Sequence, residues 1–584
     1  MYSHGASRLD QHSARFALWA PDCRNVAVEF QDGSLHPLGP EHGGWFAGTL
    51  ACPADTCYRF VIDGGLKVPD PASRQQVDGV HGFSRLVDHR AYSWRQTAWC
   101  GRPWRDAVIY ELHVGLLGGF QQVEAHLPHL AELGVTAVQL MPLGAFAGRR
   151  NWGYDGVLPF APASSYGSPD QLKQLIDKAH ELNLMVFIDV VYNHFGPDGN
   201  YLGQYASGFF RDDRMTPWGA AIDFRRPQVR DFFCENALMW LLDYRVDGLR
   251  LDAVHAIGDN DFLIELAECV RSALPRQRHA HLVLENENNS ATLLERGFDA
   301  QWNDDGHNCL HVLLTGEQEA YYADYADDPT SKLATCLEQG FIYQGQRTLR
   351  GHRRGEPSSH LPPSAFVLFL QNHDQVGNRA FGERLSLLAN PDALKAATLL
   401  LLLSPMVPLL FMGEEWGSQQ PFLFFSDYQG DLARAVREGR RNEFAAFSAF
   451  SCAQQRQEIP DPNDPATFER SRPDADSDPQ TDPAQWRALY RHLLAVRSER
   501  ICPGLDGAHS LGAQVLGNAA VSARWRLGNG QLLRIDLNLG ADAVQLARPS
   551  PGLELLCAHR VDATAFRQGQ LPARSAQALL EADA

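Results

Sequence analysis

Residues 184–194 read LMVFIDVVYNH, an apolar run that becomes polar at its end. Strands of parallel sheets are buried on both faces and are therefore continuously apolar. The chain contains eight apolar runs of this kind, and helical stretches separate most of them. Eight strand–helix units predict an α/β protein with a (β/α)₈ barrel, the TIM barrel. The other seven runs are AVIYELH (107–113), TAVQLMP (136–142), GLRLDA (248–253), HLVLE (281–285), DAQW (299–302), FVLFLQ (366–371) and PLLFM (408–412).

A doubly wound open sheet is the main alternative fold. No glycine-rich phosphate loop follows the first apolar run, which favours the barrel. Helices are expected at Val123–Leu133, from Ser168-Pro169 onward, where a cap precedes a proline, and over about Pro227–Tyr244. The apolar stretch 396–412 nearly reaches the length of a membrane span, but Pro405 and Pro408 predict a buried helix, a turn and a buried strand.

Two smaller domains are expected on either side of the barrel. Residues 1–95 alternate apolar and polar side chains between turn residues, which predicts an N-terminal β-sandwich. The barrel domain is assigned to residues 96–500, with an irregular insertion at Phe195–Arg226 and a solvated linker or loop at Asp461–Asp482. Residues 501–584 return to strand patterns around a Gly528–Gly530 turn, which predicts a C-terminal β-domain.

Composition narrows the partners and the compartment. With 52 Lys and Arg against 70 Asp and Glu, the net charge of −18 argues against nucleic acid and against anionic membranes as partners. The 11 cysteines are scattered without CxxC spacing, so neither a disulfide framework nor a zinc site is expected. The first residues, MYSHGASRLDQHS, contain no apolar signal region, and a cytoplasmic location is expected.

Charged and polar residues stand at the ends of four apolar runs. Barrel active sites lie at the carboxyl ends of the strands, so these side chains are expected to converge. Each alone could cap a helix, but apolar strands otherwise exclude charge, and the set together indicates a site. Its members are Asp189, Asn193 and His194; Arg250, Asp252 and His255; Glu285; and His373, Asp374 and Gln375.

Two of these carboxyl groups fit glycoside hydrolysis. Arg250 shares a strand face with Asp252 and would keep it ionised, as a nucleophile requires. The apolar run before Glu285 would keep it protonated. This pair suits hydrolysis with retention, for which the carboxyl groups should lie about 5–5.5 Å apart. Asp374, with His373 and His194, could stabilise positive charge. No cofactor or metal is expected, although four rim acids could alternatively form a Mg²⁺ site.

DVVYNH (189–194), DGLRLDAVH (247–255), LVLEN (282–286) and FLQNHDQ (369–375) resemble the four signature regions of the α-amylase family of glycoside hydrolases. The resemblance implies that Asp252 is the nucleophile, Glu285 the general acid/base and Asp374 the transition-state stabiliser. It also implies that His194, Arg250 and His373 belong to the sugar site. The N-terminal sandwich resembles the module of branching and debranching enzymes, which implies a domain of a carbohydrate-binding type.

The flanking segments, among them GRRNWGYDGVLPFAP (148–162), QWNDDGHN (301–308) and GEEWGSQQPFLFFSDY (413–428), resemble the trehalose-releasing branch of that family. This implies cleavage of the α-1,4-glucosidic bond next to the terminal trehalose of maltooligosyl trehalose, with related α-1,4-glucans as partners. A glycogen branching or debranching enzyme is the close alternative. A non-catalytic glucan-binding scaffold is a further one, which the three intact acids argue against. Further substrate contacts are expected from Tyr154, Trp218, His255, Asp304, Asp305, His307, Gln375 and Asn378.

Overall fold

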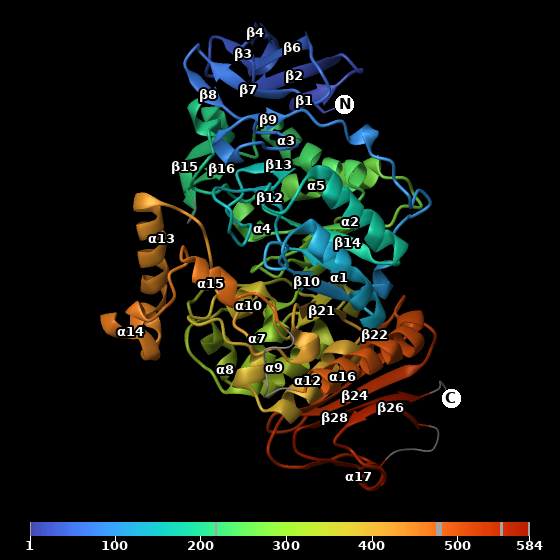
Figure 1. The fold of residues 1–584 in the computed structure, drawn as a ribbon. Coiled ribbons are helices and arrows are strands. Elements are labelled where there is room, and N and C mark those ends of the chain that lie inside the picture. Colours follow the sequence, from blue (N-terminus) through green and yellow to red (C-terminus); the bar gives the residue numbers. More distant parts are fainter. Residues whose placement is uncertain (1, 217–218, 475–481, 549–552, 582–584) are drawn as a thin grey trace.

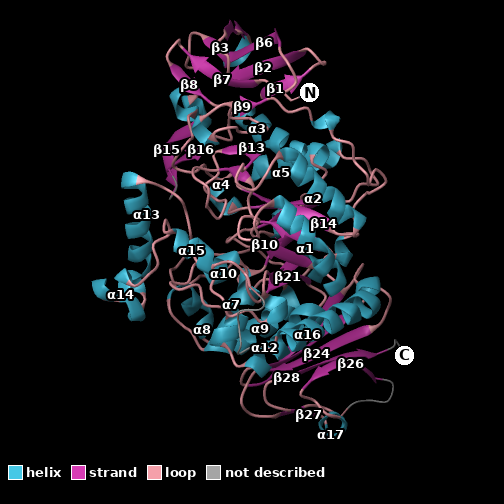
Figure 2. Cartoon of the chain, in the orientation of Figure 1, coloured by secondary structure: helices cyan, strands magenta, loops and turns pink. Residues whose placement is uncertain are grey.

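Eight parallel strands close into a barrel at the centre of the computed structural model (Figures 1 and 2). The structure describes residues 2–216, 219–474, 482–548 and 553–581. Strand order follows the chain, and the last strand pairs with the first, Ile109 opposite Leu409. Every predicted run contributes one strand, so the barrel is confirmed and the open sheet is wrong. The strands are β10 (Ile109–Leu112), β11 (Ala137–Leu140), β14 (Met185–Val190), β17 (Gly248–Leu251), β18 (His281–Leu284), β19 (Ala300–Trp302), β20 (Phe366–Phe369) and β21 (Val407–Phe411).

Helices surround the barrel and follow the expected signals. Ser168 forms a capping box with Gln171, and Pro169 occupies the first helical position. The apolar stretch 396–412 forms the end of a buried helix, a turn and a buried strand, as predicted. The main helices are α1 (Phe120–Leu133), α2 (Pro169–Glu181), α3 (Pro227–Leu238), α5 (Asn260–Ala273), α7 (Asp304–Thr315), α9 (Pro329–Gln339), α12 (Pro391–Leu403) and α16 (Pro483–Val496).

The N-terminal region forms two antiparallel sheets that pack face to face. Phe16 and Tyr58 meet between them, with ring centroids 4.9 Å apart. This is the expected sandwich, and it lies against one side of the barrel domain (Figure 1). One sheet contains β1 (Gly5–Arg8), β2 (Ser13–Trp19), β6 (Trp45–Ala51) and β5 (Gly39–Pro40); the other contains β4 (Leu35–Pro37), β3 (Val26–Phe30), β7 (Cys57–Ile62) and β8 (Leu66–Val68), with β9 (Ser84–Arg85) on β7.

The C-terminal region is a five-stranded antiparallel sheet. It packs on the barrel helices α12 and α9 at the opposite end of the molecule from the sandwich (Figure 1). The predicted turn at Gly528–Gly530 joins two of its strands, which pair in antiparallel register. In sheet order the strands are β22 (His509–Gly517), β23 (Ala520–Arg526), β24 (Leu532–Asn538), β28 (Ser575–Glu581) and β26 (Leu553–His559).

Two segments differ from expectation. The insertion after β14 is not wholly irregular, because β15 (Phe210–Thr216) and β16 (Gly219–Ile222) form an antiparallel hairpin. The Asp/Pro-rich segment from Asp461 is not simply a solvated loop either. It contains α15 (Pro465–Arg470), whose Phe468 is buried against Phe425. Residues 475–481 of that segment lie outside the described residues.

A helical arm, defined here as residues 430–457, stands out beside the barrel (Figure 1). It contains α13 (Gly430–Glu443), two short 3-10 turns at Phe444–Ala446 and Ser448–Phe450, and α14 (Ala453–Gln457). Within the described ranges, no helix is both long and apolar enough to cross a bilayer.

Candidate active site

Strand register explains why charged residues gather inside the barrel at one end. Side chains two residues apart on a strand lie on the same face of the sheet. Glu111 therefore lies on the same face as Ile109, and Asp189 lies on the same face as Phe187. The apolar members of these pairs form a buried cluster within the barrel wall. The charged members follow them at the carboxyl end, the end of the barrel that carries active sites.

Asp252 directly follows β17, and its carboxylate accepts hydrogen bonds from two side chains. Arg250 Nη1 donates to its Oδ1 over 2.8 Å, and Asn193 Nδ2 donates to its Oδ2 over 2.9 Å. Both are hydrogen bonds that a carboxylate accepts. The Arg250 side chain is fully buried and lies over the Trp302 ring, with Cζ 4.2 Å from the centroid. Asp252 is therefore fixed in place while 9% of its surface stays accessible.

Glu285 follows β18 next to the same arginine. Its Oε2 lies 3.8 Å from Arg250 Nη2 and accepts a 2.5 Å hydrogen bond from the backbone N–H of Ala253. Ala253 has a φ of 41°, a left-handed conformation that costs on the order of 1–3 kcal/mol in a non-glycine residue. Burial raises the pKa of Glu285 well above its usual range, and this effect outweighs the charge of Arg250. Glu285 is therefore a carboxylic acid that can donate a proton.

Asp374 lies in the first turn of α10 (His373–Gly377) and has the opposite character. Burial alone would raise its pKa, but the His373 charge beside it prevails and lowers the pKa of Asp374 to about 2. The pKa of His373 is in turn raised well above its usual value, because Asp374 and Glu111 outweigh its burial. Glu111 Oε1 lies 2.8 Å from His373 Nδ1, and Glu111 Oε2 accepts from the His373 backbone N–H. His373 is thus held as a cation between two acids.

Tyr154 and Asp189 form the floor beside this pair. The Tyr154 hydroxyl donates to Asp189 Oδ2 over 2.6 Å, and the Tyr154 ring stacks on His373 at 4.9 Å. Burial raises the pKa of Asp189 to about 7, although Arg250 opposes the shift. His194 is buried beside Asn193, and burial lowers its pKa, so it is neutral at pH 7.

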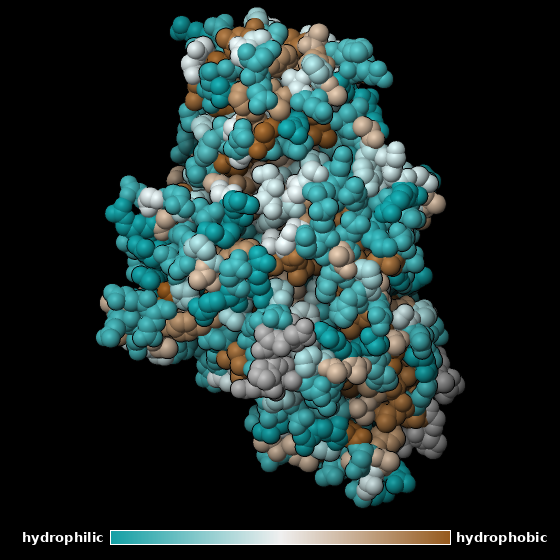
Figure 3. Space-filling view, in the orientation of Figure 1, coloured by the Kyte–Doolittle hydropathy of each residue, from teal (hydrophilic) through white to brown (hydrophobic). Residues whose placement is uncertain are grey.

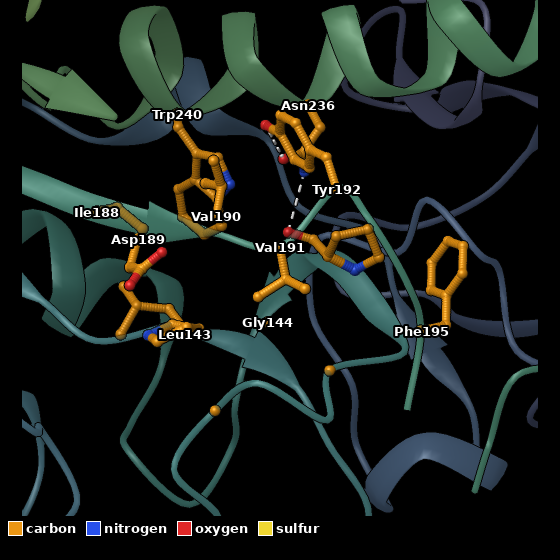
Figure 4. A pocket seen from close by; sticks show the side chains of 14 residues that line it. Leu143, Gly144, Ile188, Asp189, Val190, Val191, Tyr192, Phe195, Asn236 and Trp240 are labelled. Carbon is orange, nitrogen blue, oxygen red and sulfur yellow. Dashed lines mark hydrogen bonds between the residues drawn. The ribbon is translucent and has the colours of Figure 1, made fainter. Parts of the chain in front are cut away.

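Residues packed behind β14 hold Asp189 and its neighbours in position. Figure 4 shows Asp189, Tyr192 and Asn236 around a small cavity of about 30 Å³. The Tyr192 hydroxyl donates to Asn236 Oδ1 over 2.7 Å, and Asn236 Nδ2 donates to the carbonyl of Pro159. These bonds connect the segment after β14 to α3, and α3 to the strand β13 (Leu158–Pro162), which fixes the residues that follow β14.

A cleft of about 570 Å³ opens above the acids and is lined by Glu285 and Asp374. Four of the predicted substrate residues line it as well, namely His255, Asp304, Gln375 and Asn378. Burial raises the pKa of Asp304 to about 7, despite nearby Arg354. Volumes of roughly 300–1,000 Å³ are typical of ligand sites. The cleft therefore has the size and the polar lining of a binding site.

Among the predicted substrate residues, Asp305 and His307 are buried away from the cleft. Asp305 is fully buried, accepts hydrogen bonds from Tyr325 and Asn289, and forms an ion pair with Arg354. His307 is buried on Phe369, with Nδ1 2.8 Å from the Leu370 carbonyl. Successive helical residues are rotated by about 100°, so Asp304 faces the cleft while its neighbour supports the wall. Trp218 lies outside the described residues.

Two residues of the site were not singled out from the sequence, Glu111 and Trp302. Glu111 carried a signal, since an acid inside the apolar run 107–113 must be paired when buried. Trp302 carried none, because a tryptophan ending a short apolar run is indistinguishable from core. Its role under the Arg250 guanidinium appears only in three dimensions.

Replacing Glu111 with Gln should lower the pKa of His373 by about one to three units, because one of two supporting carboxylates is lost. NMR titration of the His373 ring measures the shift directly, and the pH profile of kcat should lose activity at lower alkaline pH. Glu132→Gln, an exposed acid on α1, is the matched control. A lower kcat with an unchanged ring titration would contradict this role for Glu111.

Among the described residues, no group of three or more His, Cys, Asp or Glu side chains has the arrangement of a metal site. The site does combine a fixed carboxylate, a protonated acid and a charged acid–histidine pair. That set can supply a nucleophile, a proton and electrostatic stabilisation from side chains alone.

Comparison with known proteins agrees with this arrangement. Residues 92–218 match the family described as alpha amylase, catalytic domain, and residues 508–577 match a domain of unknown function, DUF3459. The chain is 42% identical to a malto-oligosyltrehalose trehalohydrolase of Deinococcus radiodurans, over 83% of this chain and 81% of that protein. It is 37% identical to a protein of the same description from a Rhizobium species, over 98% and 99%.

A crystal structure of a Salmonella typhimurium protein assigned to the alpha amylases covers 100% of both chains at 42% identity, with a TM-score of 0.92. A 1,4-alpha-glucan branching enzyme of Pseudoalteromonas atlantica is 32% identical, over 60% of this chain and 56% of that enzyme. The similarity to the trehalohydrolases is thus higher and more complete than that to the branching enzyme.

Proposed function

Since this chain belongs to the malto-oligosyltrehalose trehalohydrolases of the α-amylase type, we propose that it hydrolyses the α-1,4-glucosidic bond next to the terminal trehalose of maltooligosyl trehalose and releases trehalose. The reaction belongs to trehalose formation from α-glucans and proceeds with retention. One observation supports this mechanism above the others: Arg250 lies between the two carboxyl groups. It donates a hydrogen bond to Asp252 and lies 3.8 Å from Glu285, and the pKa of Glu285 is nevertheless raised.

In the first step Asp252 attacks the anomeric carbon of the glucose unit before the trehalose. The glycosidic C–O bond breaks, Glu285 gives its proton to the leaving oxygen, and trehalose departs. A covalent glycosyl ester on Asp252 remains, and Glu285 is left as a carboxylate. The left-handed turn at Ala253 supports this division, because its N–H hydrogen bond orients Glu285.

In the second step Glu285 takes a proton from water as the water attacks the same carbon. The ester bond breaks, Asp252 leaves as a carboxylate, and Glu285 regains its proton. Asp374, whose pKa is lowered to about 2, is ionised at neutral pH. Its negative charge stabilises the positive charge of the oxocarbenium-like transition state. His373, Tyr154, His194, Arg250, His255, Asp304, Gln375 and Asn378 are assigned to substrate binding or to holding these groups.

The division of the chain at residues 95 and 500 is part of the proposal. The sandwich is complete by β9, and α16 with the following turn ends at Ile501.

The 11 cysteines are all free thiols, which supports a reducing, cytoplasmic compartment.

Incubation with maltooligosyl trehalose should release trehalose as the disaccharide product, and incubation with glycogen should leave its branching unchanged. Proton NMR should show the new reducing end first as the α-anomer, because two displacements restore the configuration. Exhaustive chelation should not alter the rate, since two carboxyl groups supply nucleophile and proton. Altered branching without trehalose would favour the branching alternative, the β-anomer first would contradict retention, and loss of activity rescued by Mg²⁺ would favour a metal-dependent enzyme.

A further inference from the structure

A second cavity of about 560 Å³ lies beside the catalytic cleft and is lined by aromatic rings. We call it the aromatic groove, and its exposed or half-buried rings are Tyr321, Phe381, Phe447 and Phe450. One wall comes from the helical arm, and the other comes from the loops after α7 and α10. Tyr321 also lines the catalytic cleft, so the groove opens on the same face of the barrel as the acids.

The groove and the cleft are continuous. Tyr321 and Asn378 line both cavities. Asn378 Nδ2 also donates to Asp374 over 3.2 Å, so one side chain joins the groove to a catalytic acid. A chain bound in the cleft can therefore run into the groove without leaving the protein surface.

The rings contact one another and leave part of their surface exposed. Phe381 from one wall touches Phe450 from the other, with centroids 5.8 Å apart, and Phe450 also rests on buried Phe444 at 5.6 Å. Tyr321 is 40% exposed, high for a large aromatic side chain. The outward surface of α13 is hydrophilic (Figure 3), so the apolar rings gather on the inner side of the arm. Sugars present apolar C–H faces that pack on such rings.

Charged groups line the same groove. Arg379 donates two hydrogen bonds to Glu317, of 2.7 and 2.9 Å, and a third to Glu383. Glu319 Oε2 accepts from the backbone N–H of Ser448 and so links the arm to the opposite wall. A carboxylate oxygen can accept more than one hydrogen bond, so the Glu317 and Glu319 carboxylates can also accept from sugar hydroxyl groups. A groove with both rings and paired charges suits an oligosaccharide better than a purely apolar partner.

We propose that the aromatic groove binds the glucose units of the maltooligosyl chain farthest from the bond that is cleaved. The inference rests on the proposed function, because it extends the same substrate beyond the catalytic cleft. It makes the groove a determinant of chain-length preference, with Phe450 and Tyr321 as specificity-determining residues.

The test compares maltosyl trehalose with maltohexaosyl trehalose as substrates of the full-length protein. For Phe450→Ala we expect kcat/KM for the long substrate to fall about 3- to 10-fold, the loss of one stacking contact, chiefly through KM. The short substrate should be unaffected. Phe450→Tyr keeps the ring and should restore the preference, and Phe83→Ala removes a half-buried ring from the N-terminal sandwich as a matched control.

If Phe450→Ala disturbs folding of the arm, Tyr321→Ala replaces it, because that side chain is exposed. Equal loss on both substrates, or no loss on either, would overturn the inference. Calorimetric binding of maltoheptaose to Asp252→Asn protein, with and without Phe450→Ala, does not depend on turnover. Weaker binding with the second substitution supports the groove even if no trehalose is released, whereas unchanged binding overturns it. A groove that binds another protein would also leave maltoheptaose binding unchanged.

Discussion

Asp252→Asn is expected to abolish turnover of maltooligosyl trehalose and of an activated α-glucosyl fluoride alike, by about 10⁴-fold or more. The amide cannot form the glycosyl ester, and a better leaving group does not replace a missing nucleophile. The fold should survive, because the amide oxygen can still accept the hydrogen bond from Arg250 Nη1. Initial rates on both substrates, with thermal unfolding as the check on folding, measure the effect.

Asp304→Asn is the matched control for that variant. Asp304 lines the cleft with Glu285 and Asp374, and burial raises its pKa to about 7, so the neutral amide resembles its protonated form. Its loss should change KM more than kcat. A variant at Asp252 that kept the fluoride reaction would reverse the assignment of nucleophile and acid.

The barrel and its acids were predictable because one physical rule produces both signals. A buried apolar strand tolerates a charged side chain only where that charge is paired, so LMVFIDVV and GLRLDA marked a strand and a site residue together. The same rule applied to Glu111 within AVIYELH, where the buried acid pairs with His373, the first residue of α10, far along the chain. Its partner could not be read from local sequence, because the two meet only when the barrel closes.

Side chains after the strands were harder to predict. Asp304, Asp305 and His307 lie within one turn of α7, but only Asp304 lines the cleft. The residue at which α7 begins determines which side chains lie on the face of the helix toward the cleft. Similarly, Phe447 and Phe450 have a helical spacing, but the spacing alone does not show whether they belong to the core or to a groove. Their shared groove depends on how the arm folds back toward the loop after α7.

Glu285→Gln should slow hydrolysis of maltooligosyl trehalose by about 10²–10⁴-fold, because the amide cannot protonate the departing trehalose. Substrate affinity should survive, since the amide resembles the protonated acid that the raised pKa of Glu285 favours. A glucosyl fluoride should be partly spared in the first step, because fluoride leaves with little protonation. Rapid-quench mass spectrometry should then find glycosyl-enzyme on Asp252, because the second step still lacks its base.

The pH profile gives an independent check of the same assignment. A raised pKa keeps the proton on Glu285 at neutral pH, so activity should fall as pH rises through that pKa. Asp374, with its pKa near 2, stays ionised over this window and cannot produce the alkaline loss. In Glu285→Gln the alkaline fall due to this group should disappear from the residual fluoride reaction. An unchanged alkaline fall in a slowed variant would assign that fall to His373, whose pKa is also raised. If the variant kept the full natural rate, the proton donor would be another group of the cleft. Of the remaining cleft acids Asp304, with its raised pKa, would then be the next to replace.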